Sequence, residues 1–78
     1  MSTTDDIGPY KFFFYSAEGV EPPHVHVRRD LATAKFWLNP IHVARSRRFT
    51  DHELLTIQKL IEENYDRIME VWNEHFGY

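Results

Sequence analysis

Apolar side chains recur at spacings of three and four residues along the C-terminal part of the chain, and this pattern constrains the fold most. The stripe consists of Leu54, Ile57, Ile61, Tyr65, Ile68, Trp72 and Phe76. Such spacing is typical of an amphipathic helix, which is stable only when its apolar face is buried against another layer. We therefore expect the preceding residues to supply an apolar surface for it.

The two ends of this helix carry clear signals. Thr50 can cap the first turn, and Glu53 stands three residues later, so the pair predicts a capping box flanked by a hydrophobic staple of Phe49 and Leu54. Gly77 predicts the C-terminal cap. An unbroken helix between these signals would have about 26 residues and be about 39 Å long.

A helix of that length is longer than any strand that could pack against it, because a strand of about six residues spans only about 20 Å. Two arrangements could bury the remaining stripe. Either the helix breaks near Asn64, or its second half packs on another chain. Of the two we expect the second, which implies a partner.

The first half of the chain has strand character. Asn39-Pro40 ends the last clear strand, and Ile41–Ala44 after it is either a short fourth strand or an irregular arm. Turns are expected at Ser16–Gly19 and at Arg29–Ala32. The segments rich in aromatic and β-branched residues, which predict strands, are Tyr10–Tyr15, His24–Arg28 and Thr33–Leu38.

These elements predict an α+β fold: a three-stranded antiparallel meander, four-stranded if Ile41–Ala44 pairs, with one face packed by a long C-terminal helix. Residues 1–9 are expected to be a disordered lead-in that ends at Gly8-Pro9, and residues 10–78 to form a single β-β-β-α domain. A chain of 78 residues needs an efficient core, and its 15% aromatic content helps to provide one.

Composition limits the function classes. The chain has no cysteine, which excludes disulfides and thiolate metal sites. Its N-terminus resembles no secretory signal and no apolar run is long enough to span a membrane, so we expect a soluble cytoplasmic protein. The net charge of −3 is unevenly distributed, since residues 1–50 are mildly basic and residues 51–78 are acidic. Such asymmetry can orient an encounter with an anion or a charged partner.

Alternation along the strands divides their side chains between two faces. One face is wholly apolar and should lie under the helix; it comprises Phe12, Phe14, Val25, Val27, Ala34, Phe36 and Leu38. The opposite face mixes rings with cations and imidazoles; it comprises Lys11, Phe13, Tyr15, His24, His26, Arg28, Thr33, Lys35 and Trp37. An open face of this kind predicts recognition of another protein, of a second copy of the chain, or of single-stranded nucleic acid stacked on its rings.

His24 and His26 follow the stiff Pro22-Pro23 pair and point to the same side of their strand. In a structural role, the imidazoles would stack on Phe13, Tyr15 or Trp37, which is the commonest situation for half-buried histidine. In a catalytic role, the two imidazoles would act as acid and base on a phosphodiester without a metal, with stabilising cations from Arg28 and Lys35.

A third alternative for this pair is a metal site. Zinc or iron could bind His24 and His26, but a further protein ligand would have to come from Glu21, Asp30, His42 or His52. Since a bare His-x-His is a weak motif, we expect no cofactor. The residues leave open whether the chain is an enzyme.

The chain resembles a family of small bacterial proteins known as domain-of-unknown-function family 4160. The matching stretches are Tyr10–Ser16, Glu21–Val27, Ala34–Leu38, Phe49–Leu54 and Trp72–Glu74. The resemblance implies a Pro-Pro-His-x-His-Val strand, a long C-terminal helix and a gene beside that of a second small protein, as in toxin–antitoxin modules. One departure is Arg47-Arg48, where the family has a basic residue followed by glycine.

Residues and resemblance together lead to one main hypothesis. The chain is expected to be a protein-binding component of a two-gene toxin–antitoxin-like module, acting as a homo-oligomer or with a small cognate protein, and with RNA as a further candidate target. The alternatives are a small metal-independent ribonuclease that uses the histidine pair and a metal-binding domain. The predicted binding face is centred on Lys11, Phe13, Tyr15 and Trp37.

Overall fold

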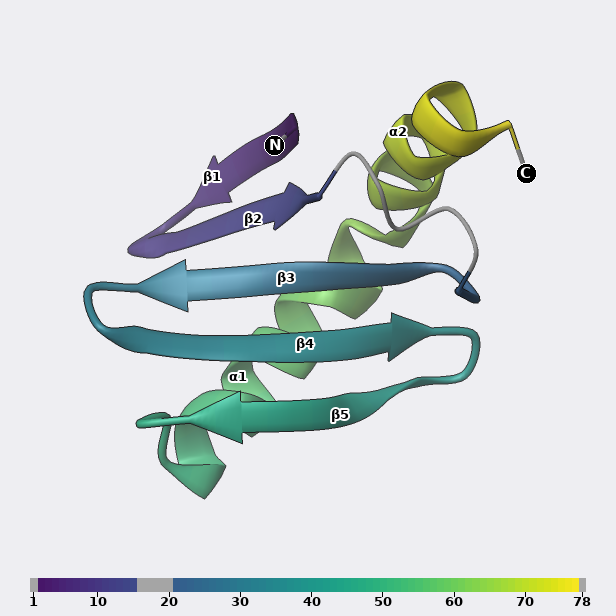
Figure 1. Cartoon of the computed structure of the whole chain (residues 1–78). Helices are drawn as coiled ribbons and strands as arrows, with labels where there is room; N and C mark the ends of the chain where they lie inside the picture. The colour runs from purple at the N-terminus through teal and green to yellow at the C-terminus, as the bar shows by residue number, and fades with distance from the viewer. Residues whose placement is uncertain (1, 16–20, 78) are drawn as a thin grey trace.

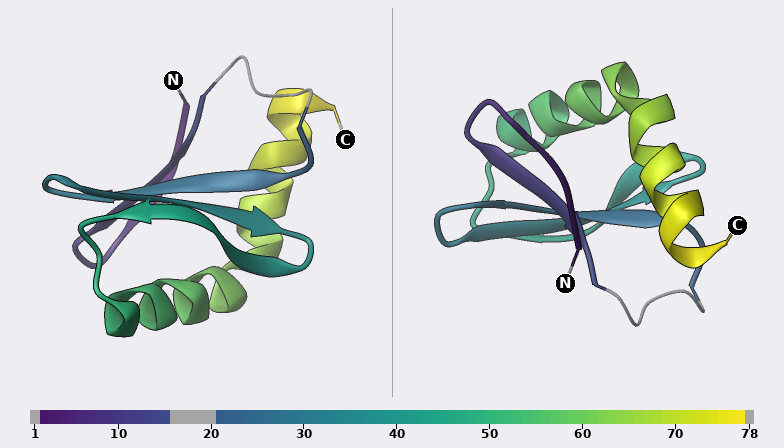
Figure 2. Two further views of the ribbon diagram at one scale, coloured as in Figure 1. Left: turned by 60° about the horizontal axis from the view of Figure 1, so that its bottom comes forward. Right: turned by 90° about the horizontal axis from the view of Figure 1, so that it is seen from above.

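The computed structural model describes residues 2–15 and 21–77 and has an α+β architecture (Figure 1). A five-stranded antiparallel sheet with strand order β1-β2-β3-β4-β5 forms one layer. Two consecutive helices form the other (Figure 2). The strands are β1 (Ser2–Ile7), β2 (Tyr10–Phe14), β3 (His24–Arg29), β4 (Ala32–Leu38) and β5 (Ile41–Arg47), and the helices are α1 (Asp51–Glu63) and α2 (Tyr65–Phe76).

The meander is larger than the sequence predicts. Residues 2–7, expected to be a disordered lead-in, form β1 and pair with β2 through a turn at Gly8-Pro9. Of the two alternatives for Ile41–Ala44, the strand is correct, but it is longer than expected: it is the first part of β5, which continues to Arg47. Both corrections have one cause: these segments have weak strand propensity and acquire order by hydrogen bonding to a neighbouring strand. The turn expected at Ser16–Gly19 lies outside the described residues.

The apolar face is confirmed as the core. The side chains predicted to lie under the helix are all buried and cluster with apolar residues of both helices. The helical members of the cluster are Ile57 and Ile61 of α1 and Ile68 and Trp72 of α2. The stripe therefore packs on this sheet along both of its halves.

The helix is not continuous, and the expectation that its second half packs on another chain is wrong. It breaks at Asn64, whose side-chain amide donates to the Leu60 carbonyl at 2.8 Å and whose backbone takes φ −114° and ψ 18°. Asparagine side chains compete with helical hydrogen bonds in this way. The break turns α2 toward the ends of β2 and β3 (Figure 2), where the Trp72 ring packs on Phe14 at 5.4 Å between centroids.

Both predicted helix caps are present. The Glu53 backbone N–H donates to Thr50 Oγ1 at 3.1 Å and the Thr50 N–H donates to Glu53 Oε1 at 3.4 Å, which completes the capping box. Gly77 adopts φ 82° and its N–H donates to the Asn73 carbonyl at 2.8 Å. A positive φ costs glycine little, which explains its position at this helix end.

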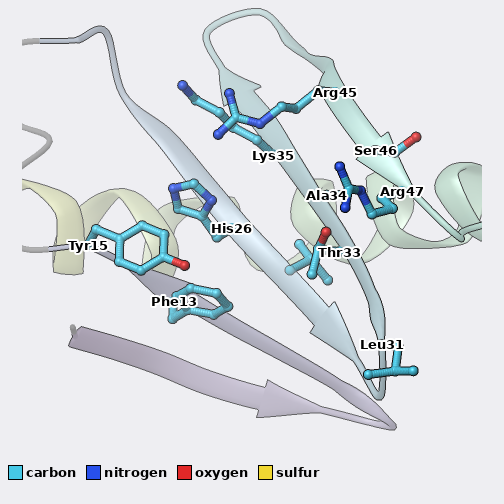
Figure 3. A pocket seen from close by; sticks show the side chains of 11 residues that line it. Phe13, Tyr15, His26, Leu31, Thr33, Ala34, Lys35, Arg45, Ser46 and Arg47 are labelled. Atoms are coloured by element: carbon cyan, nitrogen blue, oxygen red, sulfur yellow. The ribbon is translucent and has the colours of Figure 1, made fainter.

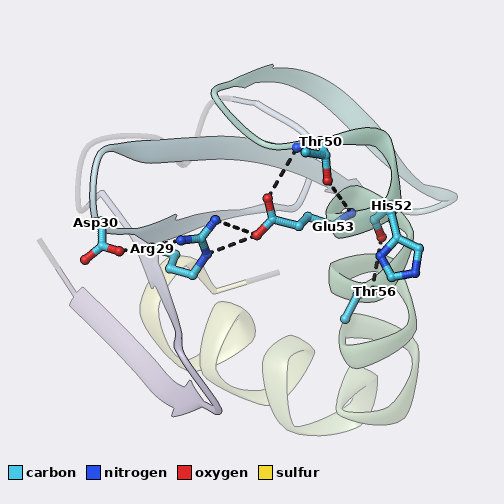
Figure 4. A network of polar contacts seen from close by, with 6 residues as sticks. All are labelled: Arg29, Asp30, Thr50, His52, Glu53 and Thr56. Atoms are coloured by element: carbon cyan, nitrogen blue, oxygen red, sulfur yellow. Dashed lines mark hydrogen bonds and ion pairs between the residues drawn. The ribbon is translucent and has the colours of Figure 1, made fainter.

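An ion pair ties the capping box to the sheet (Figure 4). Arg29 at the end of β3 donates to Glu53 Oε2 from both Nε, at 3.0 Å, and Nη2, at 2.5 Å. Burial raises the pKa of Glu53, but hydrogen bonds from the Arg29 side chain and from the Thr50 backbone outweigh burial, so that the pKa lies below its ordinary value. One carboxylate thus anchors α1 and holds it against β3.

Arg48 stands where the family resemblance led us to expect glycine. Its φ is 68°, in the left-handed region that side chains other than glycine seldom adopt. The chain therefore keeps the turn between β5 and α1 at some cost in backbone strain.

The burial of Trp72 within one chain leads to the first prediction. Trp72→Ala should lower the free energy of unfolding by about 3–5 kcal/mol, because it leaves a large cavity between α2 and the sheet. Leu55→Ala, at a helix position that is 60% exposed, is the control and should cost less than about 0.5 kcal/mol. Urea unfolding at two protein concentrations measures both losses. Equal losses, or a loss for Trp72→Ala that depends on concentration, would contradict intrachain packing.

The second prediction concerns pH. A carboxylate whose pKa is lower in the folded chain stabilises that state above its unfolded pKa, and this contribution disappears as the pH falls through the folded pKa. The urea midpoint should therefore fall on acidification below about pH 4. The urea midpoint of Arg29→Met should fall less on acidification than that of the wild type. The midpoint of Lys59→Met, a substitution on the exposed side of α1, should fall as much as that of the wild type. If the urea midpoints of all three proteins depended on pH in the same way, the acid-dependent stability could not be assigned to the ion pair of Arg29 and Glu53.

Candidate functional site

The strand register arranges the open face in rows that run across the sheet. Directly opposed residues of antiparallel strands point to the same face. One row consists of Lys11, Arg28, Thr33 and Arg47, and the next of Phe13, His26, Lys35 and Arg45. A third, shorter row consists of His24, Trp37 and His42. The register thus places the predicted face residues of β2, β3 and β4 on one side of the sheet.

An aromatic cluster occupies the β2 side of this face. The rings of Phe13 and His26 are stacked, with centroids 5.5 Å apart and an interplanar angle of 21°. The rings of His26 and Tyr15, which lies directly after β2, form a T-shaped pair with centroids 4.6 Å apart. Phe13 and His26 are buried, whereas Tyr15 is 45% exposed. Tyr15 is therefore the ring of this cluster that a ligand can reach most easily.

Lys35, in the middle of the face, has a buried side chain whose ammonium group contacts a carboxylate and an aromatic ring. Its Nζ donates to Glu21 Oε1 at 2.5 Å and lies 4.6 Å from the centroid of the Trp37 ring. The carboxylate and the ring face both favour a cation at this point. Across the strands, Lys35 is paired with His26.

Between the rings and the cations lies a concavity of about 450 Å³ (Figure 3). Phe13, Tyr15 and His26 form one wall, and Lys35 and the two arginines of β5 lie on the opposite side. This volume is in the range of small-molecule sites in proteins. The concavity offers an aromatic surface and a cationic surface that face the same space.

Arg45 and Arg47 are the functional candidates that the sequence prediction missed. The predicted strand ended at Ala44, whereas β5 continues with Arg45 opposite Lys35 and Arg47 opposite Thr33. An irregularity in pairing after Lys35 shifts the register, so that Phe36 lies opposite Val43. The alternation of arginine with Ser46 could have indicated a strand here. Charged side chains on an edge strand also discourage pairing with another chain.

His24 lies in a different environment from His26. Its side chain is fully buried, where it lies between the Trp37 ring at 5.7 Å and the Trp72 ring of α2 at 5.2 Å. Its Nδ1 is 2.9 Å from the Pro22 carbonyl and 3.7 Å from Glu21 Oε1. Such packing favours a structural role for this imidazole and hinders a reaction in which both histidines reach one substrate.

Three of the four other proposed metal ligands lie apart from the histidine pair. His42 lies two strands away from His24 in the shared row, His52 is in the first turn of α1, and Asp30 is in the β3–β4 turn. Glu21 is near His24. In the described parts of the chain, no group of three or more histidine, aspartate or glutamate side chains is arranged to hold a metal ion.

Two of the predicted cations lie at the side of the concavity. Lys11 and Arg28 are opposite one another on β2 and β3, one row away from Phe13 and His26. Arg28 is exposed and Lys11 is half-buried. They extend the positive charge of the face toward the β3–β4 turn.

The sequence model of one protein family matches residues 10–73, which is most of the chain and includes β2 to β5, all of α1 and most of α2. The chain belongs to the family described as domain of unknown function DUF4160. The open face lies within the region that matches DUF4160, whereas β1 lies outside it. No curated protein and no solved structure matches the chain. Neither helix in the described residues has the length and apolar character needed to cross a bilayer.

The burial of His24 generates the third prediction. His24→Ala should lower the free energy of unfolding by about 2–4 kcal/mol, because it removes a ring packed between Trp37 and Trp72. His42→Ala, on the exposed edge strand, is the matched control and should change it by less than about 0.5 kcal/mol. Urea unfolding gives both values. If His24→Ala left the free energy of unfolding unchanged, the packing of this ring would contribute little to stability. A catalytic role for the histidine pair would then be favoured again.

Proposed function

We propose that the chain is a binding protein that takes single-stranded nucleic acid, RNA first among the candidates, on its open sheet face. The observation that carries this proposal is the row in which Phe13, His26, Lys35 and Arg45 stand side by side across four strands. Proteins bind single strands by combining aromatic platforms for bases with cations for the backbone. This face has both in one concavity.

The two sides of the concavity would contact different parts of a bound single strand. The half-exposed Tyr15 ring can stack on one base, while the guanidinium groups of Arg45 and Arg47 can contact phosphates. Bases and phosphates of a single strand are both accessible, whereas a duplex hides its base faces. The shape therefore favours an unpaired segment over a double helix.

Binding fits this geometry better than acid–base catalysis by the histidine pair. Cleavage of a phosphodiester by two imidazoles requires both to reach the scissile group. The packing of His24 between two tryptophan rings opposes this, although His26 faces the concavity. We therefore assign His26 and Lys35 to binding, as parts of the surface that a strand would contact.

A small cognate protein is the second candidate, as the family resemblance to toxin–antitoxin-like modules suggests. One observation favours it: the carboxylate of Glu21 already pairs with Lys35 at this face. An acidic segment of a partner could make similar contacts with Arg45 and Arg47. Such a partner and an RNA would compete for the same cations.

The fourth prediction separates phosphate contacts from base stacking. Affinity for a fluorescein-labelled uridine oligomer, measured by anisotropy over a range of salt concentrations, should fall in the double variant Arg45→Gln/Arg47→Gln. The slope of log affinity against log salt should become shallower by about 1.4, or about 0.7 for each lost phosphate contact. Tyr15→Ala should cost about 1–3 kcal/mol of binding free energy with the slope unchanged.

Lys59→Gln is the control for a cation outside the open face, since it removes one positive charge from the exposed side of α1 and should leave binding unchanged. An equal loss in this control would mean that net charge alone drives binding. The proposal fails if the wild-type chain does not bind the oligomer at low salt. Binding of polyglutamate in place of the oligomer would instead support the acidic protein partner.

A further inference from the structure

We propose that Glu21 is an internal competitor: its carboxylate pairs with Lys35, the central cation of the open face, until an anionic ligand displaces it. This inference deepens the proposed function, on which it rests, by assigning a regulatory contact to the same face. It starts from the ion pair in which Lys35 Nζ donates to Glu21 Oε1 at 2.5 Å. A phosphate group would approach Lys35 from the same concavity that Lys35 lines.

The two partners differ in their exposure to water. The Lys35 side chain is 5% exposed, whereas that of Glu21 is 42% exposed. A buried ammonium group is costly without an anion beside it. Glu21, in contrast, can rotate into solvent and regain its hydration there. The carboxylate is therefore the partner that leaves when another anion arrives.

The position of Lys35 makes this exchange important for affinity. The Trp37 ring lies against its ammonium group, which gives the cation a second favourable contact besides the Glu21 carboxylate. Lys35 also lies opposite Arg45 across the strands and next to His26. An anion that replaces Glu21 would therefore lie close to all three groups.

The test compares Glu21→Gln with Asp30→Asn. Both variants remove one negative charge, but Asp30 is in the β3–β4 turn and pairs with Arg29 at 3.5 Å. Glu21→Gln should raise the affinity for the labelled uridine oligomer roughly threefold to fivefold, as expected when a competing ion pair is lost. Asp30→Asn should raise it by less than about twofold. In a Lys35→Met background, the two substitutions should no longer differ.

A second measurement uses inorganic phosphate. Phosphate should raise the thermal midpoint of Glu21→Gln more than that of the wild type or of Asp30→Asn, because Lys35 then lacks its internal carboxylate. Equal responses of the three proteins in both assays would overturn the inference, even if RNA binding persists. Selective stabilisation of Glu21→Gln by phosphate without any RNA binding would support the inference and refute the proposed function.

Discussion

The packing of Trp72 at the end of the sheet is the interaction on which the remaining arrangement depends. The apolar stripe is too long for one straight helix to bury it on strands of six or seven residues. The break at Asn64 solves this mismatch, because it lets α2 follow the sheet and deliver Trp72 to Phe14 and His24. One polar residue near the middle of the helical region therefore lets the helices close the core within the same chain.

The same packing separates the two histidines of the Pro-Pro-His-x-His-Val strand. His24 is covered from the helix side by Trp72, and it also contacts Trp37 of the open face. His26, two residues later, stacks on Phe13 and lines the concavity. A pair that looks symmetrical in the sequence thus divides into a fully buried residue and a residue that lines the concavity, and this division favours recognition over catalysis by the pair.

The open face illustrates how far sequence reasoning reaches. Period-two alternation was sufficient to separate Phe12 and Phe14 from Phe13, and the core cluster confirms that division. Alternation says nothing about neighbouring strands, and so it could not show that Arg45 lies opposite Lys35. Two cations of the site were missed for this reason. The ion pair of Lys35 with Glu21 was equally inaccessible, since it joins residues of a loop and a strand that only folding brings together.

Local signals in the sequence determined the ends of the helical region and the two faces of the central strands. The capping box of Thr50 and Glu53, the terminal Gly77 and the alternation in β2, β3 and β4 depend on residues close together in the chain. Only the tertiary structure decided that β1 and β5 join the sheet, that Trp72 is buried within the chain, and that rings and cations share one concavity. These features depend on strand pairing and on the lengths of packed layers, which are properties of the folded chain as a whole.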